Sequence, residues 1–239
     1  MPDRFATLFG RRWWPELPPT SIAGRAVGGR RAVGAVVARE PGRELARERT
    51  SDLTASPRVP AEQAVNAAPV IVTARLALRE LTIDDAPFVV RLLNDPTFLR
   101  YIGDRGVRDL DEARRYIIKG MVQSYERHGF GLWLVELSDD GHRPIGLCGL
   151  VSREGLPAPD IGFALLPDWW SQGFAFEAAT AVMEHARRVV GLARVLAIAS
   201  LQNESSVRLL KRLGFRFDSE IRMPGEAHPV GLFVCEAPA

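Results

Sequence analysis

A short loop rich in small residues has the composition of an anion-binding turn. It reads Trp170-Ser171-Gln172-Gly173-Phe174-Ala175, follows an apolar run that ends at Pro167, and opens a long amphipathic segment. Gly173 and Ala175 carry almost no side chain, so backbone N–H groups there can approach an anion closely. The first turn of a helix also has unpaired N–H groups and a partial positive charge. This order of strand, loop and helix predicts a phosphate-binding site at residues 171–175.

Two further elements accompany this loop. About thirty residues later, Asn203-Glu204-Ser205-Ser206 is typical of a helix start, with Asn203 as the N-cap. Gly214 is typical of the end of that helix. Far upstream, Thr73-Ala74-Arg75-Leu76-Ala77-Leu78-Arg79 alternates as a half-buried strand does.

In this order and at this spacing, the three elements resemble the GNAT superfamily of acetyl-CoA-dependent N-acetyltransferases, in particular its RimJ/RimL type of ribosomal-protein N-terminal acetyltransferase. The family writes the loop as Q/R-x-x-G-x-G/A, and Trp170 stands here in the Q/R position. The later element, Asn-x-x-Ser/Ala and then Lys/Arg-x-Gly-Phe, is matched by Asn203, Ser206 and the run from Arg212 to Phe215. The resemblance covers about residues 70–237 and indicates little about the acceptor.

The resemblance implies an α/β fold with a central mixed sheet and helices on both faces. It also implies acetyl-CoA as co-substrate, with no metal. The pyrophosphate of coenzyme A would lie on the loop amides. The pantetheine arm would pair with a strand edge that is exposed where two parallel strands, 160–166 and 195–200, splay apart. The residues implied in cofactor binding are Phe163, Ala164, Leu165, Ser171, Gln172, Gly173, Phe174, Ala175 and Asn203. A main-chain N–H of Phe163 or Ala164 would stabilise the oxyanion.

Two residues are candidates for proton transfer. Asp160 stands where many relatives carry a Glu, and it would be the base, acting through water. A solvated carboxylate at a strand start is the alternative, and Glu136 is the reserve base. Many GNAT members protonate the leaving thiolate with a Tyr at the position that Leu210 fills here, so the Rim-like pattern favours Ser206 as proton donor. Otherwise Ser206 is an ordinary helix serine and water protonates the sulfur.

Other residues near these motifs have simpler interpretations. Glu177, one turn beyond the loop, is expected to support the helix start. Trp169 and Trp170 either wall the cofactor loop or pack the helix start against the sheet. His128 and Tyr125 either line the acceptor pocket or lie in the core or at the surface.

Composition excludes several classes of protein. The 239 residues are 46% apolar and 25% charged, as in ordinary globular proteins, and no apolar run is long enough to cross a membrane. Two cysteines, Cys148 and Cys235, give neither a disulfide framework nor metal-ligand spacing, and Cys148 reads as a buried thiol. The four histidines have no zinc spacing. We expect a cytoplasmic protein without a metal.

Residues 1–69 differ in composition from the rest. They carry eleven arginines and seven acidic residues and show no sustained hydrophobic period. Because the whole chain has a net charge of +2, residues 70–239 have a net charge of about −2. We expect this segment to be a disordered extension, or a non-native one that results from an over-extended start. A targeting or docking role is a further alternative. The charge of residues 70–239 argues against a nucleic-acid binder.

Periodicity places the remaining elements. The pattern predicts strands at 72–80, 132–137, 145–152, 160–166, 195–200, 215–222 and 230–236. It predicts helices at 82–93, 110–127, 174–190 and 203–213. Asp95-Pro96 is predicted to stop the first of these helices.

These features predict an N-acetyltransferase that uses direct attack in a ternary complex. The acceptor would be a protein N-terminus or a small amine. No nucleic-acid or membrane partner is expected, and the enzyme would be a monomer or a homodimer. The alternative of another class is a non-catalytic acyl-CoA-binding or regulatory module, which Leu210 and the short side chain of Asp160 favour.

Overall fold

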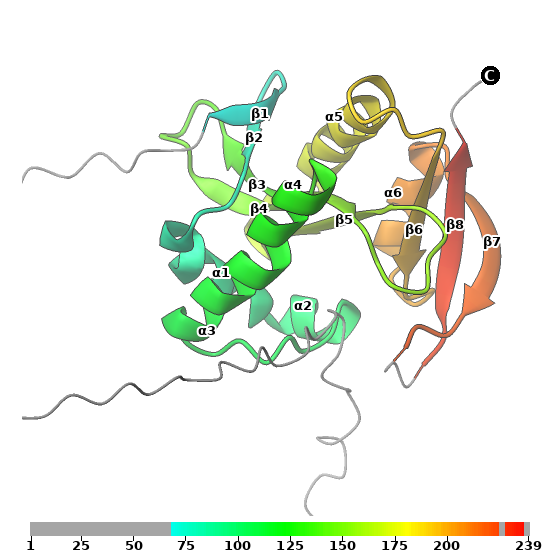
Figure 1. Ribbon diagram of the computed structural model, residues 1–239, viewed down its shortest axis with the longest axis horizontal. Helices are drawn as coiled ribbons and strands as arrows, with labels where there is room; N and C mark the ends of the chain where they lie inside the picture. Colours follow the sequence, from blue (N-terminus) through cyan, green and yellow to red (C-terminus); the bar gives the residue numbers. More distant parts are fainter. Residues whose placement is uncertain (1–67, 225–227, 237–239) are drawn as a thin grey trace, which may run out of the picture. The chain divides into compact units, whose positions relative to one another are not determined.

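A mixed sheet organises the part of the chain that the computed structural model describes, residues 68–224 and 228–236. Within these residues the sheet has eight strands in the order β1-β2-β3-β4-β5-β6-β8-β7 (Figure 1). Neighbouring strands are antiparallel except β5 and β6, which are parallel. The strands are β1 (Pro69–Val72), β2 (Leu76–Arg79), β3 (Leu132–Leu137), β4 (Pro144–Val151), β5 (Asp160–Leu165), β6 (Arg194–Ala199), β7 (Arg216–Ile221) and β8 (Val230–Glu236).

The first predicted strand, 72–80, is correct for residues 76–79 and wrong before them, because the chain turns at residues 73–75. β1 and β2 form an antiparallel pair around Thr73–Arg75. The Thr73 hydroxyl accepts a hydrogen bond from the Leu76 N–H at 3.0 Å, and the Thr73 N–H donates to the Leu76 carbonyl at 2.8 Å. A threonine whose hydroxyl bonds the backbone three residues later favours a turn, which apolar periodicity does not reveal.

Helices precede β3, and one of them was not predicted. They are η1 (Ile83–Asp85), α1 (Ala86–Leu93), α2 (Pro96–Tyr101), α3 (Leu110–Tyr116), the π-helical η2 (Ile117–Val122) and α4 (Gln123–His128). Asp95-Pro96 follows the end of α1 but also starts α2. The Asp95 carboxylate accepts a hydrogen bond from the Thr97 N–H at 2.8 Å, and Pro96 occupies the first helical position, where its missing N–H costs nothing.

Helices cover both faces of the sheet, as the resemblance implies. α5 (Phe174–Arg188) packs its small and apolar face, including Ala178 and Val182, against one side. The opposite side is covered by α1, α2, α3 and η2. In β3 the side chains alternate accordingly, because Trp133 and Val135 belong to the core under α5 and Leu134 to the other core.

The second half of the chain follows the predicted order. After β5 come η3 (Pro167–Trp169), α5, β6, α6 (Glu204–Arg212), β7 and β8. The strands from β3 onward begin and end within about one residue of their predicted limits. No helix among the described residues is long and apolar enough to span a bilayer. The expectations for the N-terminal extension concern residues 1–69. Residues 1–67 lie outside the described residues, and Pro69 is the first residue of β1.

Candidate active site

In the described chain, β5 and β6 are paired in register at one position. Asp160 lies opposite Leu196, and the Leu196 N–H donates to the Pro159 carbonyl at 2.9 Å. Beyond this pair the two parallel strands diverge, as the resemblance implies. The edge of β5 that faces β6 is therefore open beyond this pair, from Gly162 onward.

The hydrogen bonds of β5 decide which of its amides face this opening. The Leu166 N–H donates to the Ile145 carbonyl, on the β4 side, at 3.0 Å. β5 pairs with β4 without a register shift, so successive residues point their N–H groups to alternate sides. Phe163 and Leu165 then direct their N–H groups into the opening, whereas Ala164 directs its N–H toward β4. Of the two amides named from the sequence, Phe163 has the orientation that an oxyanion needs.

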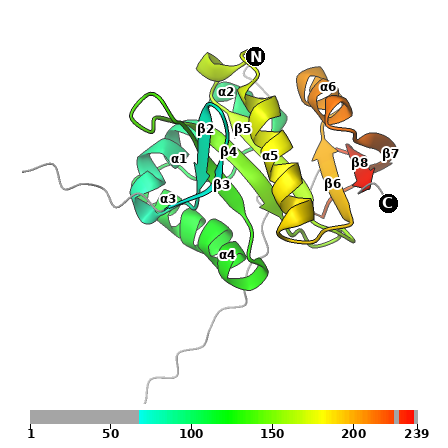
Figure 2. The ribbon, with the colours of Figure 1, turned by 90° about the horizontal axis from the view of Figure 1, so that it is seen from above.

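A cleft of about 1320 Å³ occupies the divergence. α5 lies alongside β4 and β5, and α6 lies alongside β6, so these two helices flank it (Figure 2). The structure brings together here most of the site residues predicted from sequence, namely Asp160, Phe163, Ala164, Leu165, Ser171, Gly173, Phe174, Ala175, Asn203 and Ser206. Gln172 does not line the cleft, because its side chain turns back to donate to the Asp168 carbonyl at 2.9 Å.

The 171–175 loop has the backbone of an anion-binding turn. Ser171 and Gly173 both adopt left-handed conformations, with φ of 59° and 83°. Gly173 is the N-cap of α5, and no described side chain accepts a hydrogen bond from its first amides. Because α5 is 15 residues long and begins at the cleft, its N-terminal partial charge and free N–H groups face the space where an anion would lie.

Asp160 is buried at the head of the opening. Its side chain is 1% exposed, and the Arg153 Nε donates to Oδ1 at 2.8 Å and to Oδ2 at 3.0 Å. Burial raises the pKa of Asp160, and the charge and hydrogen bonds of Arg153 only partly oppose this. The carboxylate is therefore held in place by an arginine that also lines the cleft.

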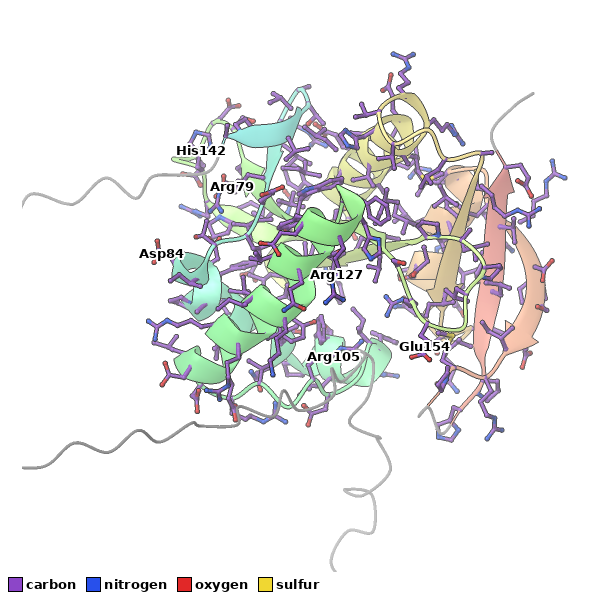
Figure 3. All side chains as sticks on the ribbon, in the orientation of Figure 1. Arg79, Asp84, Arg105, Arg127, His142 and Glu154 are labelled. Atoms are coloured by element: carbon purple, nitrogen blue, oxygen red, sulfur yellow. The ribbon has the colours of Figure 1, made fainter. Side chains whose placement is uncertain are left out.

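Glu136, the reserve base, does not line the cleft. It is buried on β3, where its carboxylate accepts from the Arg79 Nε at 3.0 Å, and His142 Nδ1 lies 3.5 Å from its other oxygen. Arg79 also pairs with Asp85 at 2.8 Å. Figure 3 shows Arg79 and His142 at the same end of the sheet. Sequence reasoning could not separate the cleft from this network, because both require a buried carboxylate on a strand.

The start of α6 places Asn203 and Ser206 in the cleft. The Asn203 side-chain oxygen accepts a hydrogen bond from the Ser206 N–H at 3.2 Å, which confirms the N-cap. Both side chains are half-buried and line the cleft. Leu210 lies one turn beyond Ser206 and is buried in the core, so the position of the family tyrosine is filled by an apolar group.

The remaining candidates divide between the cleft wall, to which both tryptophans contribute, and positions away from it. Trp170 lines the cleft and donates its indole N–H to the Leu165 carbonyl at 2.8 Å, and Trp169 packs edge-on against Phe174. Tyr125 bonds the Leu132 carbonyl, and its burial raises its pKa. His128 is exposed at the end of α4 and stacks on Phe130. Neither Tyr125 nor His128 lines the cleft.

The two cysteines are free thiols inside the described fold. Cys148 and Cys235 are both buried. Burial raises the pKa of Cys148 to about 12, so its thiol stays protonated and unreactive at neutral pH. Among the described residues, no group of three His, Cys, Asp or Glu side chains is placed to hold a metal ion.

The wall of the cleft opposite the loop was missed by the sequence analysis. It comes from α2, the segment after it and the end of α3, together with the β4–β5 loop. It combines aromatic and charged side chains, among them Tyr101, Arg105, Tyr116 and Arg153. The available signal was the Asp95-Pro96-Thr97 start of α2, which reads equally well as a helix stop.

Comparisons with known proteins agree with this geometry. A family model described as an acetyltransferase (GNAT) domain matches residues 75–216. The protein named "Uncharacterized N-acetyltransferase YoaA" of Bacillus subtilis (strain 168) is 28% identical over 156 residues, which cover 64% of this chain and 86% of that protein. The ribosomal protein uS5-alanine N-acetyltransferase of Escherichia coli (strain K12) is 29% identical over 98 residues, which cover 40% of this chain and 50% of that protein.

A solved structure shares the fold. RimL, a ribosomal L7/L12 alpha-N-protein acetyltransferase in complex with coenzyme A, superposes with a TM-score of 0.61 at 19% identity. The match covers 70% of this chain and 97% of that chain.

Proposed function

This chain belongs to the GNAT acetyltransferase family, and we propose that it transfers an acetyl group from acetyl-CoA to a primary amine by direct attack in a ternary complex. One observation carries the proposal: the cleft between the diverging β5 and β6 joins buried Asp160, an open strand edge and the 171–175 loop. A ligand with an amide-rich arm and a diphosphate needs a strand edge and an anion site in one channel.

The residues present fit acetyl-CoA. The left-handed Gly173 lets backbone approach a diphosphate closely, and the first amides of α5 are available to it. The open edge of β5 offers the N–H and carbonyl of Phe163 and the N–H of Leu165 to the pantetheine arm, because the Leu165 carbonyl already accepts from the Trp170 indole. Asn203 lies across the cleft on α6 and would contact that arm. When bound, acetyl-CoA supplies the thioester that the amine attacks.

Stabilisation of the developing charge is assigned to β5. The Phe163 N–H points into the opening and would donate to the thioester oxygen as it becomes negative. A main-chain donor of this kind is already oriented before the reaction, so no reorganisation is needed when the charge develops.

Asp160 is proposed as the base, acting through a water molecule. Its burial raises its pKa, which suits a group that must accept a proton from an ammonium ion near neutral pH. The Arg153 ion pair fixes the carboxylate, so a water between Asp160 and the amine would have a fixed acceptor.

Ser206 is proposed as the donor that protonates the leaving thiolate. Its backbone is fixed by the Asn203 cap, and its side chain lines the cleft. Leu210, one turn further, has no proton to give, whereas the Ser206 hydroxyl carries a transferable proton.

The acceptor is proposed to be an α-amine of a peptide before a small-molecule amine. The E. coli relative is named for an alanine of ribosomal protein uS5, and RimL is named a ribosomal L7/L12 alpha-N-protein acetyltransferase. An α-amine, with a pKa of about 8, also loses its proton more readily than a lysine side chain, with a pKa of about 10.4. A weak base such as the carboxylate of Asp160 therefore suits an α-amine better than a lysine side chain.

An amine panel tests the proposal. The full chain is incubated with acetyl-CoA and each amine, and free thiol is measured against a no-protein control. The panel contains N-terminal peptides that begin with alanine or serine, polyamines, and aminoglycosides. We expect thiol release with peptides and a matching mass increase for one acetyl group. Binding of acetyl-CoA without thiol release for any amine would instead support a binding module.

A further inference from the structure

The turn between β1 and β2 contacts the start of α5. Thr73 Oγ1 donates to Glu177 Oε1 at 2.7 Å, and the Arg75 backbone N–H donates to the same oxygen at 3.0 Å. Glu177 is in the first turn of α5, about a hundred residues later in the chain. A segment outside the cleft is thus tied directly to the helix that begins at the 171–175 loop.

The Arg75 guanidinium contacts the loop itself. Its Nη1 donates to the Gln172 carbonyl at 3.1 Å, and its carbon lies 4.3 Å from the centre of the Phe174 ring. A Cβ placed on Gly173 would lie 3.4 Å from Arg75 Nη2. One side chain therefore touches the residues on both sides of Gly173 and lies against Gly173 itself, and it remains 44% exposed.

The same guanidinium neutralises Glu177. Arg75 Nε donates to Glu177 Oε2 at 2.7 Å, and Nη2 lies 2.6 Å from that oxygen. Partial burial alone would raise the pKa of Glu177, but the bonds from Thr73 and Arg75 outweigh this and lower the pKa below its ordinary value. Glu177 is therefore ionised at neutral pH, one turn from the place where a diphosphate would bind. Without Arg75, this negative charge would be uncompensated.

We propose that Arg75 and Glu177 form a clamp that positions the 171–175 loop and keeps its charge favourable for the diphosphate of coenzyme A. Glu177 holds the guanidinium in a fixed orientation, and the guanidinium holds the Gln172 carbonyl away from the cleft. The loop amides are thereby left free for the ligand. This inference rests on the proposed function and assigns a role to the Thr73–Arg79 segment.

Binding of coenzyme A without turnover tests the clamp. Arg75→Gln is compared with Arg194→Gln, a matched control at the first residue of β6. It removes an arginine that is 54% exposed, against 44% for Arg75, and that pairs with Glu236 of β8. We expect Arg75→Gln to weaken coenzyme A binding by about tenfold or more in calorimetry. Arg194→Gln should stay within about twofold of wild type, since it removes no contact of the loop.

A second ligand separates positioning of the diphosphate from general damage to the fold. Pantetheine lacks the diphosphate, so its binding, followed by ligand-observed NMR, should be the same in Arg75→Gln as in wild type. Arg75→Lys should recover part of the coenzyme A affinity, because it keeps the charge but not the forked contact. Equal losses for coenzyme A and pantetheine, or no loss for coenzyme A, would overturn the clamp. If the wild type binds no coenzyme A, the proposed function itself fails, which is a different result.

Discussion

Asp160 lies where β5 and β6 part, with its carboxylate against the Arg153 guanidinium. If Asp160 removes the amine proton through water, Asp160→Asn should lower kcat/KM by about a hundredfold or more. The loss should be largest below the pKa of the amine, where most of the acceptor is protonated. It should shrink above about pH 8, where an α-amine is already neutral. The measurement is kcat/KM for the best peptide between pH 6 and 9.

Glu154→Gln is the matched control for this variant. Glu154 is an exposed carboxylate on the same loop as Arg153 and does not line the cleft. Its removal should leave the pH profile unchanged. A wild-type profile in Asp160→Asn would make Asp160 a structural partner of Arg153 and leave deprotonation to water alone.

Ser206 makes a separate prediction about the leaving group. Ser206→Ala should lower kcat by about a hundredfold, because a positioned acid typically contributes that much or more. The affinity for acetyl-CoA should stay nearly unchanged, since the Asn203 cap uses the Ser206 backbone and not its hydroxyl. Single-turnover kinetics and calorimetry give the two quantities. Ser219→Ala, on β7 and outside the cleft, serves as the control, and equal rates in both variants would exclude Ser206 as the donor.

For single residues, the sequence predicted an interaction correctly where its two partners are close together in the chain. The Asn203 cap depends on residues three apart, so the pattern predicted it correctly. The Asp160–Arg153 pair depends on the return path of the β4–β5 loop, and the Arg75–Glu177 pair joins residues 102 apart. No spacing rule reports contacts of that kind. The roles of these groups in catalysis and in cofactor binding remain predictions.

At the scale of elements, the junction of the 171–175 loop with α5 gives the next prediction. Gly173→Glu should abolish the thermal shift that coenzyme A causes, because it places a negative side chain at a left-handed residue beside the diphosphate site. Gly191→Glu is a matched control, since Gly191 is also left-handed and exposed, with φ of 78°, but follows the other end of α5. Differential scanning fluorimetry with millimolar coenzyme A compares the two. A normal shift in Gly173→Glu would contradict the assigned diphosphate site.

Strands and helices could be predicted where one hydrophobic period continues along the whole segment. β3 and β8 match their predicted limits, and α5 follows its amphipathic pattern closely. The β1–β2 hairpin and α2 were missed, because single residues decide them. The Thr73 hydroxyl bonds the Leu76 backbone, and the Asp95 carboxylate caps α2. Because α2 was missed, the wall of the cleft that α2 and the segment after it form was missed too, since no motif marks it.

At the scale of the whole molecule, the described residues contain both the sheet and the cleft. A protein that begins at residue 68 should therefore fold and bind coenzyme A. Coenzyme A at a hundred times its dissociation constant should stabilise it by about 2.7 kcal/mol. Circular dichroism melts with and without coenzyme A, run beside the full chain, make the measurement. A truncated chain that is unfolded, while the full chain is folded, would show that residues 1–67 contribute to the fold.

The single pairing between β5 and β6 has a mechanical consequence for the proposed reaction. It leaves two antiparallel half-sheets, β1 to β5 and β6, β8 and β7, that share one backbone contact at Asp160 and Leu196. A pantetheine arm bound along β5 would act as an additional strand and would connect the two half-sheets. The two half-sheets would then move least relative to each other while coenzyme A is bound, and most just after it is released. Among residues 161–165, the amides that face the opening between β5 and β6 should exchange with solvent most slowly when coenzyme A occupies it. Their hydrogen-exchange rates would therefore change through the catalytic cycle.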